Sequence, residues 1–197
     1  MAVVPTLPTA HMIAAFSFGD SQLLFRAFAF RLQNAGDTFG RNTPLRDYNY
    51  AMLEQWFLLL DRLDARSSFA PSIAAYYFSQ SQEPKRDLPY IIRYLDAAYD
   101  RDPAKRWWWL SQAVYLANHR LGDKQLALRL AYKLGTTPAD VPLWARQMPA
   151  FIHEQMGEKE QALVIIQNIL KDQKNIPDGE LRFMEYFIRD RLKAANE

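Results

Sequence analysis

Apolar residues recur three or four positions apart along most of the chain, and no segment shows the strict alternation of a half-buried strand. Capping and turn residues divide this pattern into nine segments, which we predict to be helices joined by short turns. They cover about residues 21–34, 43–64, 67–83, 88–99, 102–121, 124–134, 142–156, 158–172 and 177–194. The pattern therefore predicts an all-α chain.

Asp and Thr residues before several of these segments predict where the helices begin. Asp20 is the expected N-cap of the first helix, and Thr43-Pro44 and Asp102-Pro103 each combine a capping side chain with a proline in the first turn. Pro84 is expected to end one helix. Pro89 then falls within the first turn of the next, where a missing N–H costs little.

The width of the apolar face distinguishes a stack from a bundle. On the helix predicted at 124–134, apolar residues cover about two thirds of the circumference, opposite Gln125, Arg129 and Lys133. A helix contacted on both sides by neighbouring repeats needs such a wide face. The first helix is apolar in nearly every direction, so the preceding residues cover it or it docks another molecule.

An internal offset of 35 residues supports the stack. Four pairs of identical residues share this offset: Gly122 and Gly157, Ala127 and Ala162, Trp109 and Trp144, and Gln112 and Gln147. Self-similarity near this period is typical of helical-repeat proteins, whose helix pairs bury their apolar faces against their neighbours. The period predicts a binding scaffold.

The segments 122–128 and 157–163 share the pattern G-x-x-x-x-A-L, which resembles the second half of a tetratricopeptide repeat. The segments 63–66 and 100–103 resemble two further repeat ends. This resemblance implies an α-solenoid of stacked antiparallel helix pairs. It comprises about four degenerate repeats over residues 37–177, between a leading helix at about 20–35 and a closing helix at about 178–195. Residues 1–18 would be a loose lead-in, and 19–197 a single domain.

The first helices of the repeats depart from the family pattern. They lack its Leu-Gly pair and its central Tyr, and Trp109 and Trp144 lie two positions early relative to the following glycine. The half-repeat helices of RNA-processing factors and the 35-residue pentatricopeptide family are therefore alternatives. The resemblance implies a protein-binding scaffold and supplies no catalytic residues.

Composition narrows the class of protein. The chain has 197 residues, a net charge of +2 and no cysteine, which excludes disulfides and thiolate metal sites. The small charge and the lack of a long basic run make nucleic acid an unfavoured partner. The sequence contains no run of 18 apolar residues, so it predicts no membrane span.

Nothing in the sequence fixes the compartment. The cytoplasm is favoured, with an extracytoplasmic or membrane-tethered location as the alternative if an N-terminal anchor was removed. His11-Met12 is a dipeptide that cloning junctions leave. If it has this origin, residues 1–11 are not native.

The helix at 102–121 carries the candidate binding residues. Its polar and aromatic side includes Trp108, Tyr115 and Asn118, which suit an interface. Transfer from the concave face of tetratricopeptide repeats selects instead Trp109, Gln112, Leu116, His119 and Arg120. Gln112 and His119 satisfy both arguments, and their equivalents 35 residues on are Gln147 and Glu154. The alternative is that Trp108 packs against the preceding repeat.

Catalysis and metal binding find little support in the sequence. His119 and His153 take nearly equivalent places in successive repeats, but no carboxylate stands at ligand spacing, so we expect neither a metal nor a cofactor. No glycine loop for phosphate and no serine in a nucleophile-elbow pattern occurs. We therefore expect a non-enzymatic adaptor that binds a peptide or partner subunit. One alternative is a subunit that oligomerises, or docks onto a larger and even membrane-associated complex, through Phe25, Phe28 and Phe30. The other alternative is an RNA-binding repeat protein.

Overall fold

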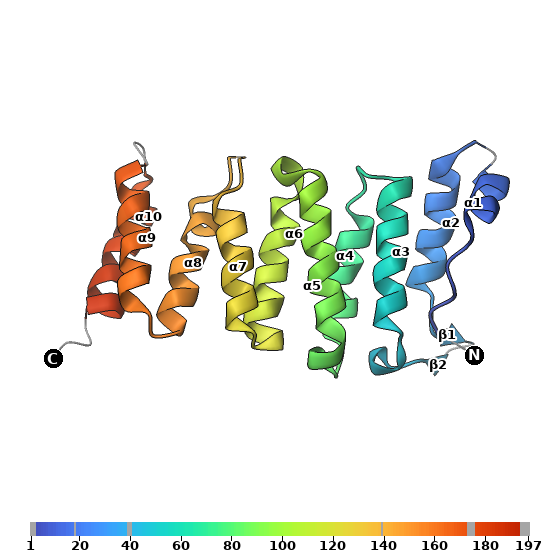
Figure 1. Cartoon of the computed structure of the whole chain (residues 1–197), viewed down its shortest axis with the longest axis horizontal. Coiled ribbons are helices and arrows are strands. Elements are labelled where there is room, and N and C mark those ends of the chain that lie inside the picture. The colour runs from blue at the N-terminus through green and yellow to red at the C-terminus, as the bar shows by residue number, and fades with distance from the viewer. Residues whose placement is uncertain (1–2, 18, 39–40, 139, 173–175, 194–197) are drawn as a thin grey trace. The chain divides into compact units, whose positions relative to one another are not determined.

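The computed structural model describes residues 3–17, 19–38, 41–138, 140–172 and 176–193 (Figure 1). This part of the chain is all-α, as predicted. Its β structure is limited to β1 (Asp37–Thr38) and β2 (Arg41–Asn42), which pair antiparallel in the turn after the second helix. The chain divides into two compact units, residues 1–101 and 102–197, and each is described by itself.

Ten α-helices make up the described part of the two units. The first unit contains α1 (Ala10–Ser17), α2 (Ser21–Gln33), α3 (Tyr50–Leu63), α4 (Phe69–Tyr76) and α5 (Pro84–Arg101). The second contains α6 (Pro103–Tyr115), α7 (Lys124–Gly135), α8 (Leu143–Gln155), α9 (Lys159–Asp172) and α10 (Asp178–Tyr186). Helices α6 and α10 continue as π-helical backbone over Leu116–Leu121 and Phe187–Lys193. The predicted end of the last helix, at about 194–195, lies outside the described residues.

The capping predictions were right at Asp20 and Asp102 and wrong at Thr43. The Asp20 carboxylate accepts from the backbone N–H groups of Gln22 and Leu23. Thr43 instead donates its N–H to the carbonyl of Gly36, 2.9 Å away, which holds residues 43–48 as a connection beside the small hairpin. Helix α3 begins only after Asn49, whose side chain caps the N–H of Met52 at 3.0 Å.

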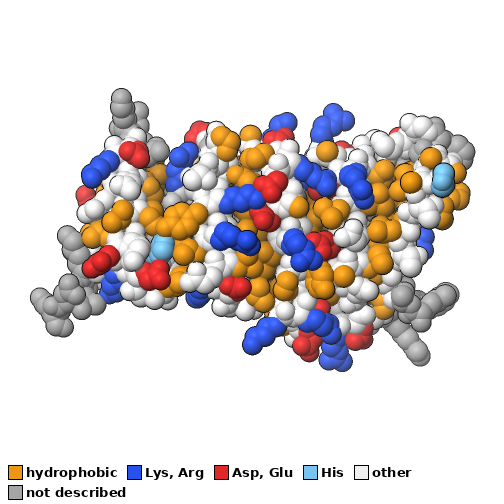
Figure 2. All heavy atoms as spheres, viewed as in Figure 1, with side chains coloured by type: hydrophobic (Ala, Val, Ile, Leu, Met, Phe, Trp, Pro, Cys, Tyr) orange, Lys and Arg blue, Asp and Glu red, His pale blue; other side chains and the backbone are white. Residues whose placement is uncertain are grey.

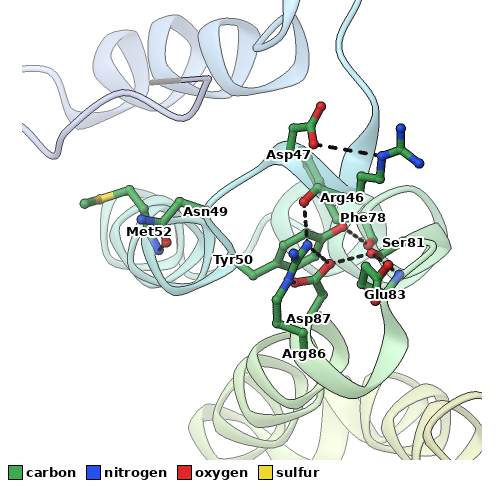
Figure 3. Close-up of polar contacts among 10 residues, drawn as sticks. All are labelled: Arg46, Asp47, Asn49, Tyr50, Met52, Phe78, Ser81, Glu83, Arg86 and Asp87. Atoms are coloured by element: carbon green, nitrogen blue, oxygen red, sulfur yellow. Dashed lines mark hydrogen bonds and ion pairs between the residues drawn. The ribbon is translucent and has the colours of Figure 1, made fainter. Parts of the chain in front are cut away.

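Pro84 begins α5, so the prediction that it ends a helix was wrong. Proline lacks only an N–H that the first turn leaves unpaired in any case. Figure 3 shows the contacts that fix this start. The buried Asp87 carboxylate accepts from Ser81 Oγ at 2.5 Å and from Arg86 Nε at 2.7 Å, and the Tyr50 hydroxyl donates to the carbonyl of Phe78 at 2.8 Å. These bonds connect three parts of the unit: α3, the turn that follows α4, and the start of α5.

Helix α3 is the centre of the first unit and contacts α2, α4 and α5. Its Trp56 and Phe57 side chains are fully buried, and Phe57 lies 4.9 Å from Tyr94 of α5 between ring centroids. Two acidic side chains of α3 pair with arginines of α5. Glu54 bonds Arg93 at 2.5 Å, and the buried Asp61 lies 3.3 Å from Arg101.

The aromatic side chains of α2 do not act together at the surface, contrary to the prediction. Phe25 packs edge-on against Phe69 at 6.3 Å, and Phe28 packs against Trp56 at 5.4 Å. Phe30 alone of the three is exposed, with 71% of its surface accessible. Phe28 is half-buried, whereas Phe25 is buried, so docking through Phe25 would require the core of this unit to open.

The residues before α2 also differ from the predicted loose lead-in. Helix α1 forms within them and contacts α2. Val4 is buried, and Trp56 Nε1 donates to the carbonyl of Pro5 at 2.8 Å. The apolar composition of this segment allows it to cover part of the first unit.

In the second unit, each helix from α6 to α8 contacts the helix that follows it, and the π-helical end of the chain contacts α9. The offset of 35 residues persists in the structure. Gly122 and Gly157 both have a left-handed backbone, with φ of 76° and 80°, and both end a helix before a tight turn. Ala127 and Ala162 are both fully buried. Within the described residues, no helix is long and apolar enough to cross a membrane.

Candidate functional site

Three tryptophan rings meet between α6 and α8. Successive helical residues point about 100° apart, so the run 107–109 divides: Trp109 enters the core, whereas Trp108 stays 41% exposed and Trp107 half-buried. Trp144 of α8 completes the group. Its ring centroid lies 5.9 Å from Trp107 and 6.3 Å from Trp108, both edge-to-face.

A shallow pocket adjoins these rings between α8 and α10. Trp144, Gln147 and Phe151 line it from α8, and Gly179, Glu180 and Phe183 line it from α10. The Phe151 and Phe183 rings stand nearly perpendicular, at 84°, with centroids 5.8 Å apart. Because Trp144 belongs both to the tryptophan group and to the pocket, the apolar surface is continuous across three helices. We call Trp107, Trp108, Trp144, Phe151 and Phe183 the aromatic surface.

A polar network lies at the turn between α6 and α7. Asn118 is buried and donates from Nδ2 to Gln155 Oε1 at 3.1 Å, while Lys124 Nζ donates to both amide oxygens at 2.7 and 2.6 Å. His119 Nε2 lies 3.1 Å from the Asn118 amide, and its ring packs 5.0 Å from that of Tyr115. The network ties the end of α6 to the end of α8 and leaves His119 and Tyr115 exposed.

Two further predicted residues make contacts with the end of the chain. Gln147 is 1% exposed and donates from Nε2 to Glu180 Oε2 at 3.2 Å. Glu154 is half-buried and pairs with Arg191, accepting from Nε at 3.0 Å and from Nη2 at 2.7 Å. Both side chains hold α8 to the α10 segment, so they position the surface.

The seven predicted residues therefore fall into three groups. Trp108 lies on the aromatic surface, and Gln112 is half-buried one turn further along α6. Tyr115, Asn118 and His119 belong to the polar network, and Gln147 and Glu154 connect α8 to the α10 segment. The prediction missed Trp144, Phe151 and Phe183. In the sequence Trp144 stands out only as the residue 35 positions after Trp109, and no sequence signal relates the closing helix to α8.

A phenol, an imidazole and a carboxylate form a chain at the next turn. The Tyr132 hydroxyl lies 2.7 Å from His153 Nε2, and His153 Nδ1 lies 2.5 Å from Glu158 Oε2. Burial, followed by the charge of Glu158, raises the pKa of Tyr132, so its phenol stays protonated and is a weak nucleophile. His153 lies 35 residues after Asn118, and each of the two side chains connects helices at a turn.

Metal and nucleic-acid binding gain no support from the geometry. No three His, Asp or Glu side chains of the described residues are placed to hold a metal together. His119 contacts Asn118 and Tyr115, whereas His153 contacts Tyr132 and Glu158. On the face drawn in Figure 2, Lys and Arg are interspersed with Asp and Glu instead of forming a basic strip.

A second pocket lies in the first unit, lined by Arg46, Tyr48, Tyr50, Arg86 and Asp87 among others. Its charged groups already contact one another: Arg86 pairs with Asp87 and donates to the carbonyl of Arg46 (Figure 3). A ligand would have to displace contacts that fix the start of α5, so the aromatic surface is the better candidate.

Comparison of the chain with protein-family models, with curated proteins and with solved structures gave no match in any of the three. A function for the chain must therefore follow from its own geometry.

Proposed function

We propose that this chain is a non-enzymatic binding scaffold with a tetratricopeptide-like architecture, which binds a peptide or partner protein on the aromatic surface. The architectural part is supported by the second unit. There α6 with α7 and α8 with α9 have the same glycine turn and the same buried alanine at an offset of 35 residues. Helix α10 then takes the position of the first helix of a third repeat.

The observation that carries the proposal is the aromatic surface. Indole and phenyl rings on α6, α8 and α10 line one open pocket and its edge, although tryptophan is costly to leave in water. Clustered, partly exposed aromatic rings are typical of binding hot spots, because they offer a large contact area with little side-chain entropy to lose. In a stacked array, the first helices of successive repeats line one side, which is where these rings lie.

A capture experiment with two matched variants tests the proposal. The Trp108→Ala/Phe183→Ala variant removes the two most exposed rings of the surface, whereas Tyr76→Ala/Val164→Ala removes two exposed apolar side chains elsewhere. We expect the native chain and the control to capture the same partner in a quantitative pull-down, and the surface variant to lose at least about tenfold, as for one hot spot. Equal capture by all three would refute the proposal.

A second candidate function is an assembly contact through α1 and α2. Four apolar side chains of these helices are exposed: Met12, Phe16, Leu23 and Phe30. Exposed apolar groups of this size indicate an interaction surface when they lie together. This contact would join the chain to a partner subunit or to a second copy, independently of the aromatic surface.

A further inference from the structure

The pocket between α8 and α10 combines aromatic walls with one carboxylate. Trp144, Phe151 and Phe183 supply the rings, and Glu180 supplies the charge. Rings present a negative face, which attracts a cation, and cages of this composition bind ammonium and guanidinium groups. We propose that this pocket binds the Lys or Arg side chain of a partner peptide, an inference that rests on the proposed function and names its partner chemistry.

The walls are held in place before any ligand arrives. Phe183 stacks on the buried Phe187 with centroids 6.2 Å apart and planes 25° apart, and Phe151 meets Phe187 edge-on at 5.2 Å. Trp144 is fixed on its other side by Trp107 and Trp108. A cage whose rings are already ordered loses little side-chain entropy when it binds.

The carboxylate is also oriented. Gln147, buried beneath the pocket, donates its amide N–H to Glu180 Oε2. Asp178 adds a second acidic side chain in the first turn of α10. The negative charges of Asp178 and Glu180 together outweigh the partial positive charge of the helix N-terminus. Arg182 lies two residues beyond Glu180, about 200° around the helix, and is exposed without lining the pocket. The local charge therefore favours a cation.

An apolar side chain suits the pocket less well than a cationic one. It would cover the partly exposed Glu180 carboxylate without replacing the hydrogen bonds that water makes to it, which is costly. A Lys or Arg side chain places its methylene stem against the rings and its charge beside Glu180. Because the pocket adjoins the tryptophan rings of α6, the neighbouring residues of the peptide would lie along the aromatic surface.

The test uses the full chain and four capped Gly/Ser heptapeptides that carry Arg, Lys, citrulline or norleucine at the centre. Citrulline has the shape of Arg without its charge, and norleucine has the stem of Lys without its amine. Binding is followed by tryptophan fluorescence and by NMR shifts at low salt. We expect the Arg and Lys peptides to bind about two- to fivefold more tightly than their neutral counterparts, the range that one exposed cation–π contact gives.

Three variants locate the effect. Glu180→Gln and Phe183→Leu should each reduce the preference for Arg over citrulline, one by removing the charge and the other by removing a ring face while keeping apolar volume. Glu185→Gln is the control, since Glu185 is exposed on the same helix and does not line the pocket. Thermal unfolding by circular dichroism checks that each variant stays folded.

The outcomes separate this inference from the proposed function. Equal binding of Arg and citrulline, no binding of any peptide, or an unchanged preference in Glu180→Gln would overturn the cation pocket. Tighter binding of free butylguanidinium than of the Arg peptide would also overturn it, because the site would then serve a small molecule. The pull-down with Trp108→Ala/Phe183→Ala tests the scaffold by capture of a protein, so either result can fail without the other.

Discussion

Tyr48 and Tyr50 show how single polar atoms are accommodated in the first unit. Both side chains are buried, and both hydroxyls donate to backbone carbonyls, Tyr48 to Ala35 and Tyr50 to Phe78. Burial raises the pKa of Tyr48 to about 12, with the charges of Tyr77 and Asp37 adding to the effect, and burial also raises the pKa of Tyr50. The neutral phenols are therefore part of the native structure.

This arrangement predicts a loss of stability in alkali. Above pH 10 the unfolded chain releases these phenolic protons while the folded chain keeps them, so the free energy of unfolding falls as pH rises. For Tyr48 this fall continues up to about pH 12, where the folded chain also releases the proton. Each such group contributes a slope of about 1.4 kcal/mol per pH unit. Tyr48→Phe should reduce the slope by that amount between pH 10 and 12, measured by urea unfolding.

Tyr186→Phe is the matched control, because Tyr186 is an exposed tyrosine in the second unit. Its slope should equal that of the native chain. If the Tyr48→Phe slope also equals it, Tyr48 ionises alike in the folded and unfolded states, and burial does not hold its phenol neutral.

Residue patterns in a sequence show that the run 107–109 must divide between core and surface, because the helical angle between neighbours is fixed. They could not identify which rings meet Trp108, because that depends on how α6 and α8 pack. Trp144 illustrates the difference: its offset from Trp109 indicated a shared repeat position, yet Trp109 is buried and Trp144 is half-buried against Trp107 and Trp108.

At the scale of elements, helix ends were predictable where a side chain contacts its own backbone. Asp102 and Asp20 cap the helices expected, and Gly122 and Gly157 end theirs in the left-handed conformation. The start of α3 was not predictable from Thr43-Pro44, because Thr43 bonds the backbone of Gly36 on the far side of the β1–β2 turn. Such a contact between separate segments leaves no local signal.

Asp123 provides the prediction at this scale. Its carboxylate accepts from the N–H of Leu126 at 2.9 Å and begins α7, the helix that contacts both α6 and α8. Asp123→Ala should cost about 1 kcal/mol, the usual contribution of such a cap. Because α7 contacts two other helices, this loss should appear as a fall in Tm of about 4–8 °C for a unit of this size. Asp123→Asn retains a capping oxygen and should stay within about 0.5 kcal/mol of the native chain; a similar loss in both variants would show that charge, not capping, matters there.

At the scale of the whole molecule, the sequence predicted one array over 19–197, whereas the contacts form two units that divide between Arg101 and Asp102. The capping pair Asp102-Pro103 was recognised as a helix start, but a cap does not show whether the preceding helix packs more closely with what comes before it. The two candidate surfaces accordingly belong to different units: the aromatic surface to residues 102–197, and the α1/α2 contact to residues 1–101.

The α1/α2 contact predicts self-association. Leu23 and Phe30 lie seven positions apart, about two turns along one side of α2, and are 51% and 71% exposed. We expect the mass of the native chain in light scattering to rise with concentration, because pairing two such faces removes these side chains from water. Leu23→Ser/Phe30→Ser should remain monomeric with little change in Tm, since neither side chain is part of the core. Phe28→Ser, which removes a half-buried ring packed on Trp56, should instead destabilise the first unit by about 1–2 kcal/mol. A native chain that stays monomeric at every concentration would exclude self-association through this contact.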